Sequence, residues 1–331
     1  MRVLVLSRTE TESLLDLDAL RHALRAAMTD LSAGRASMPP RIAAMVPERG
    51  LLAAMTAHLQ GSEALAAKLV SLFPANAGTR LPTHQAVVIV FDADCGEPLA
   101  LLDGTSITTL RTAAGSALSA ELLAREDAAT LAILGTGVQA RAHAEAMVRV
   151  RPIQRIRVAG RNPDRVASLC SALQDSLGLP VVAADGYADA CADADLICAA
   201  THSPDPVVHR DCLRPGAHVT SVGYNTAGRE VDSASVADAL VVVESRDAVL
   251  APPPSGGNDL RAPIEEGLIG PEHIHAEVGE LLMGTKPGRT SPDQITLYKS
   301  VGVAAQDVAA AHLVLNAARE RSVGLQVDLF A

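Results

Sequence analysis

Two glycines and an alanine stand at the junction between an apolar run and a run of helical composition, in the stretch LAILGTGVQARAHAEAM (residues 131–147). Gly135 would permit a tight turn, Gly137 would let the backbone approach a pyrophosphate, and Ala140 would keep the helix close to the sheet. The helix N-terminus would supply unpaired N–H groups for the anion. This spacing predicts a dinucleotide-binding turn if a strand precedes it and a helix follows it.

The flanking chain has the required order. From residue 130 onward, short apolar and β-branched runs alternate with segments of helical composition. The runs are TLAILG, RIRVAG, VVAAD, DLICAAT, HVTSVG and ALVVVES. Runs of this kind, mostly apolar on both faces, are typical of a parallel sheet covered by helices. They predict an α/β Rossmann domain with a doubly wound parallel sheet, and they place the glycines in its first β-to-α turn.

The end of the second predicted strand, VAGRNPDR, indicates which dinucleotide is used. An enzyme that prefers NAD usually has an acid there, about 20 residues past the glycines, to bind the ribose hydroxyls. Here Arg161 and Asn162 take that position, and Asp164 follows Pro163, where the first turn of the next helix is expected. Because a guanidinium can bind a 2′-phosphate through two hydrogen bonds, the stretch favours NADPH, with NADH a weaker cofactor. The alternative is a solvated surface arginine.

The chain before residue 130 follows a different pattern. Residues 2–6 predict a strand, and the apolar spacing in DLDALRHALRAAM predicts a helix with one buried face. From residue 39 to residue 104, short β-rich runs separated by Gly, Pro and Asp indicate an antiparallel sheet. Helical periodicity returns in residues 107–127. The last helix and strand have no place in a doubly wound pattern, so we expect them to return to the first domain.

Composition limits the class of protein. The chain has 331 residues, of which 48% are hydrophobic, so it can bury two sizeable cores. It shows neither a long apolar run nor the features of a signal peptide, which predicts a cytoplasmic protein. Its net charge of −10 and its three Tyr and three Phe without Trp argue against a nucleic-acid partner. The five cysteines lack CxxC spacing, and no metal site is predicted, including at His273 and His275.

Lysine is rare in this chain. Of 28 basic residues only Lys68, Lys286 and Lys299 are lysines. Chance placement is one interpretation. Unlike a guanidinium, however, an ammonium can be made titratable by burial, so each of the three is a candidate for chemistry.

Three stretches together resemble the ornithine cyclodeaminase and mu-crystallin family: ALLDGTSITTLRTAAGSALSAELLARED, LAILGTGVQARAHAEAM and YKSVGVAAQDVAAA. The likeness runs from SMPPRIAAMVP to the C-terminal helix. It implies a Rossmann domain (126–300) inserted into an α+β substrate-binding and dimerisation domain made from both chain ends (1–125 and 301–331). It also implies a homodimer that acts on a small imino or amino acid, with no nucleic-acid or membrane partner.

The resemblance also implies a substrate site. By motif, the family's carboxylate-binding arginines fall on Arg41 in PPRIAAM and Arg111 in TLRTAAG, and its lysine falls on Lys68 in AAKLVSLFP. A carboxylate suits a bidentate cation, and the reacting nitrogen needs a proton donor or an electrostatic partner. Because Lys68 lies in an apolar, strand-like run, burial would lower its pKa and suit it to act as an acid. Thr83 is a further predicted substrate contact. Without the family, each cation would be interpreted as an ordinary surface or ion-pair residue.

Two departures from the family bear on the reaction. Cyclodeaminases of this family look as if they need an aspartate in the loop after the fifth strand and a glutamate in the early strand region. Here Asn225 takes the first place and Ala54 the second. An amide cannot accept a proton as a base, so the machinery that oxidises an amine and expels ammonia is missing. Asp232 could replace the aspartate only if the loop were shifted.

The sequence therefore predicts NADPH-dependent reduction of a small cyclic ketimine carboxylate, Δ1-pyrroline-2-carboxylate to L-proline. Δ1-Piperideine-2-carboxylate, which would give L-pipecolate, differs by one methylene, worth only about 1 to 3 kcal/mol in an apolar pocket. The alternatives are an alanine-type dehydrogenase, an ornithine cyclodeaminase and a non-catalytic NADPH-binding protein. Lys68 and Asn225 are the predicted catalytic residues. The predicted cofactor contacts are Thr112, Gly135, Thr136, Gly137, Val138, Gln139, Arg161, Asn162, Thr201, Val222 and Val301.

Overall fold

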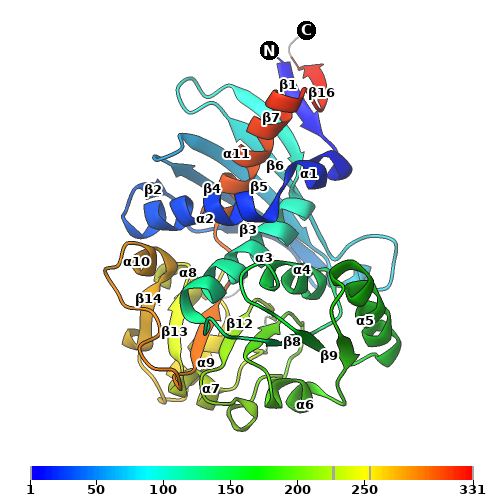
Figure 1. Ribbon diagram of the computed structural model, residues 1–331. Coiled ribbons are helices and arrows are strands. Elements are labelled where there is room, and N and C mark those ends of the chain that lie inside the picture. Colours follow the sequence, from blue (N-terminus) through cyan, green and yellow to red (C-terminus); the bar gives the residue numbers. More distant parts are fainter. Residues whose placement is uncertain (1, 226–227, 253–254, 330–331) are drawn as a thin grey trace. The chain divides into compact units, whose positions relative to one another are not determined.

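The computed structural model describes residues 2–225, 228–252 and 255–329. The chain folds into two compact units, each with its own β-sheet (Figure 1). Unit 1 comprises Met1–Arg111 together with Gly302–Ala331, and unit 2 comprises Thr112–Val301. The fold is mixed α/β, as predicted, and both chain ends contribute to unit 1.

Unit 1 contains a mostly antiparallel sheet. Its strands are β1 (Arg2–Leu6), β2 (Ala36–Ser37), β3 (Ile42–Val46), β4 (Gly50–Leu59), β5 (Ala64–Leu72), β6 (His84–Phe91), β7 (Pro98–Asp103) and β16 (Leu325–Asp328). Their order is β16-β1-β7-β6-β5-β4-β2, and β3 also pairs with β4. β1 and β7 run parallel, whereas the other paired strands run antiparallel. The last strand therefore joins the first one, as expected.

Helices cover one face of this sheet. Unit 1 holds α1 (Arg8–Leu14), α2 (Leu17–Ser32), the 3-10 helix η1 (Pro74–Asn76), the first part of α3 (Gly104–Leu123) and α11 (Ala304–Arg321). The predicted helix α2 begins after Asp16, which caps it, and buries Leu20 and Leu24. α11 is buried along most of its length and packs against α2 and against β4, β5 and β6 (Figure 1). The core of unit 1 lies between α11 and the sheet.

Unit 2 contains a fully parallel sheet. Its strands are β8 (Thr130–Leu134), β9 (Arg155–Ala159), β10 (Val181–Ala183), β11 (Leu196–Ala199), β12 (His218–Ser221), β13 (Leu240–Val243), β14 (Ile274–Glu277) and β15 (Thr296–Lys299). The order is β10-β9-β8-β11-β12-β15-β13-β14, and every pair is parallel. The first five positions follow the doubly wound Rossmann order, with the glycine turn after the central strand β8.

β14 and β15 have no counterpart among the strands predicted from the sequence. The four residues of β15, TLYK, are all buried, although two of them are polar. Thr296 is 0% exposed and Lys299 is 1% exposed, because their polar atoms bond within unit 2. A strand whose polar side chains are satisfied by distant partners has no apolar signature that a local pattern can reveal.

Short connections and helices flank the strands of unit 2. They are α4 (Val138–Met147), α5 (Pro163–Leu177), α6 (Tyr187–Ala192), η2 (Arg210–Cys212), α7 (Ser233–Asp238), α8 (Arg246–Leu250), α9 (Asn258–Glu265), η3 (Pro271–His273) and α10 (Val278–Leu282). Across the part of the chain that the structure describes, none of the helices combines the length and the apolar character needed to cross a membrane.

Candidate substrate and cofactor sites

The register of the sheet in unit 1 determines what surrounds Lys68. Met55 on β4 pairs with Lys68 on β5, and Lys68 pairs with Val88 on β6. Since paired residues of antiparallel strands project from the same face, these three form one row on the buried face. This is the face that α11 covers. Arg41 immediately precedes β3. Ile42 pairs with Ala54 in antiparallel register, so one further step of that register places Arg41 opposite Met55.

A buried carboxylate of α11, Asp307, joins two of the predicted cations. The Lys68 ammonium donates to Asp307 Oδ2 at 2.6 Å, and Arg111 Nε on α3 donates to Asp307 Oδ1 at 3.1 Å. Lys68 is 2% exposed, Arg111 is 5% exposed and Asp307 is 1% exposed. The three side chains come from distant parts of the sequence, and the structure brings them together. Asp307 is not among the predicted site residues, although an acid within an alanine-rich helix is a recognisable signal.

The arginines are oriented by further contacts. Arg111 Nη1 donates to the side-chain oxygen of Gln306 at 2.8 Å, and Arg41 Nη2 donates to the carbonyl of Gly302 at 2.6 Å. Gly302 has a positive φ of 74°, and a Cβ there would lie 2.6 Å from Arg111 Nη2. The positive φ favours glycine, and a side chain here would displace the guanidinium. The chain that re-enters unit 1 is therefore shaped around Arg111.

The electrostatics of this group, called the cationic cluster (Arg41, Lys68, Arg111 and Asp307), favour an anion. Burial lowers the pKa of Lys68 to about 8; Asp307 opposes this shift, and Arg111 and Arg41 add to it. Burial alone would raise the pKa of Asp307, but Arg111 and Lys68 outweigh it and hold that pKa below its ordinary value. With Lys68 protonated, three cations face one carboxylate, so a second carboxylate could be bound. The direction of this shift agrees with the expectation that burial lowers the pKa of Lys68.

Two sequence predictions in unit 1 change in the light of the register. Ala54 lies beside Met55 on β4, and neighbouring strand residues point to opposite faces, so Ala54 points away from Lys68. The residue that pairs with Lys68 is Met55, whereas Ala54, the predicted counterpart of the family's glutamate, pairs with Leu69 on the opposite face. Neither residue carries a carboxylate. Thr83 precedes β6 and accepts the Phe73 N–H through its carbonyl, beyond the far end of β5. The structure does not bring Thr83 to the cationic cluster.

In unit 2 the glycine turn has the geometry of a phosphate cradle. Gly135 has a φ of 118°, and a Cβ there would lie 2.5 Å from the carbonyl oxygen of Ala200. Gly137 is the N-cap of α4 and has no side chain to cap the first N–H groups, and a Cβ there would meet open space. Thr136, Val138 and Gln139 complete the turn, and Val138 is exposed. The free N–H groups and the open space fit a pyrophosphate.

The end of β9 presents one basic side chain. Asn162 caps α5 by accepting the N–H of Arg165 at 3.0 Å, and Asp164 lies in the first turn of α5, as expected. Arg161 is exposed, and no described residue forms a hydrogen bond or ion pair with its guanidinium. Its donors are therefore available to a ligand. Asn162, by contrast, uses its side-chain oxygen for the cap.

The other predicted cofactor contacts lie mainly where strands end. Thr201 follows β11, Val222 follows β12, and Val301 follows β15. These are carboxyl ends of parallel strands, the edge at which open α/β sheets bind ligands. The N–H of Val301 donates to Glu244 at 3.0 Å. Thr112 lies in the buried middle of α3.

Asn225 and Asp232 both serve local structure. The Asn225 amide donates to the carbonyl of His202 at 3.1 Å and accepts the N–H of Gly228 at 3.1 Å, so it bridges its own loop to the loop after β11. Asp232 caps α7 by accepting the N–H of Ser235 at 2.7 Å. Neither is positioned as a free base. The structure therefore gives no support for Asp232 as a replacement aspartate.

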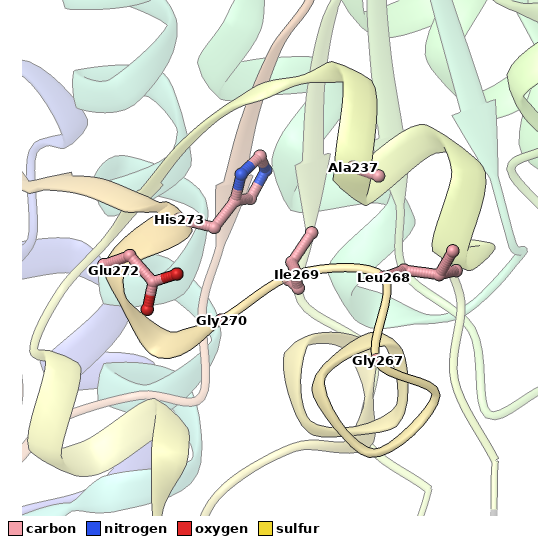
Figure 2. A pocket seen from close by; sticks show the side chains of 7 residues that line it. All are labelled: Ala237, Gly267, Leu268, Ile269, Gly270, Glu272 and His273. Atoms are coloured by element: carbon pink, nitrogen blue, oxygen red, sulfur yellow. The ribbon is translucent and has the colours of Figure 1, made fainter.

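A surface hollow of about 660 Å³ lies elsewhere on unit 2 (Figure 2). It is lined by Ala237, Gly267, Leu268, Ile269, Gly270, Glu272 and His273, none of which is a predicted site residue. His273 bonds the carbonyl of Val236 at 2.8 Å, and His275 bonds that of Pro287 at 2.8 Å. Within the described ranges, no group of three or more His, Cys, Asp and Glu side chains could hold a metal ion.

A Rossmann sheet with a phosphate cradle in one unit, together with a buried cationic cluster in the other, defines the class of nicotinamide-dependent oxidoreductases. The model of the ornithine cyclodeaminase/mu-crystallin family matches residues 1–322, and the chain belongs to this family. It is 34% identical to a Δ1-pyrroline-2-carboxylate reductase of Bacillus cereus, over 98% of this chain and 100% of that protein.

Solved structures agree with this placement. The structure of Thermococcus litoralis Δ1-pyrroline-2-carboxylate reductase with NADH and L-proline has a TM-score of 0.94 and 36% identity, covering 98% of this chain and 100% of that one. An archaeal alanine dehydrogenase dimer with bound NAD has a TM-score of 0.93 and 32% identity, covering 100% of both chains. The protein is an oxidoreductase that uses a nicotinamide cofactor.

The two glycines of the turn should respond differently to a methyl group. Gly135→Ala should lower the free energy of unfolding by roughly 1–3 kcal/mol, the cost of a strained backbone position, because a Cβ would meet Ala200. Gly137→Ala should keep its stability, since its φ is −89°, but should weaken cofactor binding by filling the cradle. Urea unfolding and fluorescence titration with NADPH measure the two effects. Equal losses of stability, or normal binding by Gly137→Ala, would contradict this assignment.

Proposed function

We propose that this protein reduces the C=N bond of a small cyclic ketimine carboxylate, with Δ1-pyrroline-2-carboxylate as the preferred substrate and L-proline as the product. The observation that carries the proposal is the buried cationic cluster, in which a lysine with a pKa of about 8 lies beside Met55 rather than beside a second carboxylate. The similarity to the Bacillus cereus reductase supports the substrate, as does the Thermococcus litoralis structure that holds L-proline.

The residues of unit 1 can perform the steps that this reduction requires. Arg111 and Arg41 would bind the substrate carboxylate through charge-assisted hydrogen bonds. The ammonium of Lys68 would give its proton to the imine nitrogen, and Asp307 would keep that ammonium oriented. The glycine turn of unit 2 would hold the cofactor, which would supply a hydride for the carbon of the C=N bond. The product thus gains one hydride at carbon and one proton at nitrogen, and solvent returns a proton to Lys68.

Cyclodeamination is a poorer match to this site. That reaction needs a base to take a proton from an amine, and each such step needs a group of suitable pKa. Asp307 is the carboxylate of the cationic cluster, but Lys68 and Arg111 lower its pKa and occupy both of its oxygens. Asn225 has an amide, which does not act as a base. Reduction of a ready-made imine needs positioning and one proton donor, which this cluster offers.

A substrate panel tests the function. With NADPH present, Δ1-pyrroline-2-carboxylate should be converted to proline at a high rate and Δ1-piperideine-2-carboxylate to pipecolate at a comparable or lower rate, because the two rings differ by one methylene. Pyruvate with ammonia should react slowly, and ornithine with catalytic NAD should release negligible ammonia. Ammonia release from ornithine at a rate like that of imine reduction would overturn the assignment. Binding of NADPH without consumption of any imine would indicate a non-catalytic binding protein.

The role of Lys68 predicts a pH profile. Below pH 8 the ammonium carries the proton, and above it the proton is lost, so kcat/KM should fall as pH rises through about 8. Lys68→Met should lower kcat by about 10²–10⁴-fold, the usual contribution of a general acid, and should abolish that fall. Steady-state rates from pH 6 to pH 10 measure both effects. An unchanged rate and profile in Lys68→Met would mean that the lysine is only structural.

We further propose that NADPH is preferred over NADH. The exposed guanidinium of Arg161 at the end of β9, with no acid in the position that binds ribose hydroxyls, supports this preference. The two structural relatives hold NADH and NAD, so they do not support a preference for NADPH. The proposal rests on Arg161 of this chain alone.

Removing the Arg161 guanidinium tests the preference. Arg161→Ala should raise the KM for NADPH about tenfold or more, as the loss of a hydrogen bond to a charged group does, and should barely change the KM for NADH. Arg165→Ala, which removes an exposed arginine of α5, is the matched control and should leave both constants unchanged. Equal effects of Arg161→Ala on both cofactors would exclude recognition of the 2′-phosphate.

Unit 1 also offers a surface for a second copy of the chain. Ile42, Ala54, Leu69 and Val87 form one row across four strands, on the face opposite Lys68. Ile42 is 72% exposed and Val87 is 40% exposed, and exposed apolar patches often mark interfaces. The dimeric archaeal relative supports a homodimer through this face. Ile42→Asp should therefore shift the protein from dimer to monomer in analytical ultracentrifugation.

The free cysteines support the expected cytoplasmic location.

A further inference from the structure

Unit 2 contains a second buried group of charges, which the proposed mechanism does not use. Glu230 is 2% exposed, Asp259 is 3% exposed and Lys299 is 1% exposed. Burying charged groups is costly unless they are paired, so such a group persists only if its bonds are well made. Lys299 is also one of the three lysines in the chain. These three residues are called the buried relay.

Glu230 ties two loops together. One carboxylate oxygen accepts the backbone N–H of Thr201 at 2.6 Å and its hydroxyl at 2.7 Å. The other oxygen accepts the hydroxyl of Ser221 at 2.9 Å and the N–H of Gly223 at 2.7 Å. Thr201 follows β11, and Gly223 lies just after β12. A single side chain therefore fixes the starts of the loops that leave two neighbouring strands.

Asp259 and Lys299 hold Glu230 in place. Asp259 Oδ1 accepts the backbone N–H of Glu230 at 2.8 Å, and its Oδ2 pairs with the Lys299 ammonium at 2.9 Å. Lys299 also donates to the hydroxyl of Ser221 at 3.1 Å and to the carbonyl of Gly223 at 2.9 Å. All three N–H donors of the ammonium are thus used. Two of them bond to Ser221 and Gly223, the same residues that Glu230 bonds.

The strand order indicates which half of the cofactor these loops serve. The glycine turn after β8 takes the pyrophosphate, and the adenosine ribose lies at the end of the second strand, β9, in a sheet of this type. β11 and β12 lie on the opposite side of β8 from β9. The nicotinamide half must then extend over the loops that begin at Thr201 and Val222. These are the loops that the buried relay fixes.

We propose that Glu230, Asp259 and Lys299 are positioning residues for the nicotinamide half of the cofactor. They do not touch the reacting atoms, and they act through Thr201, Val222 and Gly223, whose backbone they hold. The proposal rests on the proposed cofactor site of unit 2 and is independent of the identity of the substrate. It makes a prediction that a purely structural role does not, because this strand order would place the adenosine half at the end of β9, on the other side of β8 from these loops.

Binding of NADPH and of 2′-phospho-ADP-ribose, which lacks nicotinamide, separates the two roles. Glu230→Gln keeps the side chain's volume but replaces one oxygen with a donor, and Lys299→Met removes the ammonium. Both variants should bind NADPH about tenfold or more weakly, as the loss of hydrogen bonds to charged groups implies, and should bind the fragment within about twofold of the wild type. Lys286→Met, the same change at an exposed lysine, should bind both as the wild type does.

Calorimetry without substrate measures these constants, so a wrong substrate assignment does not affect them. Ser221→Ala, which removes only the hydroxyl between Lys299 and Glu230, is the milder variant if the others fold poorly, and it should show the same selective loss at smaller size. Equal weakening of both ligands, or no weakening of NADPH, would overturn the proposal. The proposal would also be refuted if the wild type bound the fragment as tightly as NADPH, because the nicotinamide half would then contribute nothing to binding. A wild type that binds neither ligand would refute NADPH as the cofactor, and NADH with ADP-ribose would then make the same comparison.

Discussion

The pairing of one buried carboxylate, Asp307, with two cations is the interaction on which unit 1 depends. Lys68 and Arg111 are almost fully buried, and without Asp307 each would be an uncompensated charge in the interior. The carboxylate does not neutralise the whole cluster, so a positive charge remains, and in the proposed function it attracts the substrate carboxylate. The same bonds thus hold β5, α3 and α11 together and prepare the site chemically.

The two units use buried charge in different ways. In unit 1 the cationic cluster has an excess of positive charge, and the low pKa of Lys68 follows from its burial among other cations. In unit 2 all three N–H donors of the Lys299 ammonium are bonded within the protein, to Asp259, Ser221 and Gly223. One lysine is therefore suited to exchanging a proton, and the other to holding backbone in place. Arginine could replace neither without changing the geometry.

Much of the fold could be predicted from local patterns, and much of the site could not. The strands around the glycine turn are continuous apolar runs, and Gly135 and Gly137 have fixed spacing, so periodicity and motif sufficed there. Asp307 and the relay of Glu230 with Lys299 depend on contacts between residues far apart in the chain, which no local pattern contains. The register of β4 against β5 likewise decides whether Met55 or Ala54 faces Lys68, and a shift of one residue reverses the answer.

The order of the units along the chain has a consequence for folding during synthesis. The bond between Lys68 and Asp307 joins residues 239 positions apart, and all of unit 2 is made between them. Domains generally fold as they emerge from the ribosome. Unit 2 can therefore complete its sheet first, while β4, β5 and β6 wait for α11 to cover their apolar face. Unit 1 is the first to be translated and the last to be finished, and in that interval it exposes the surface most in need of a chaperone.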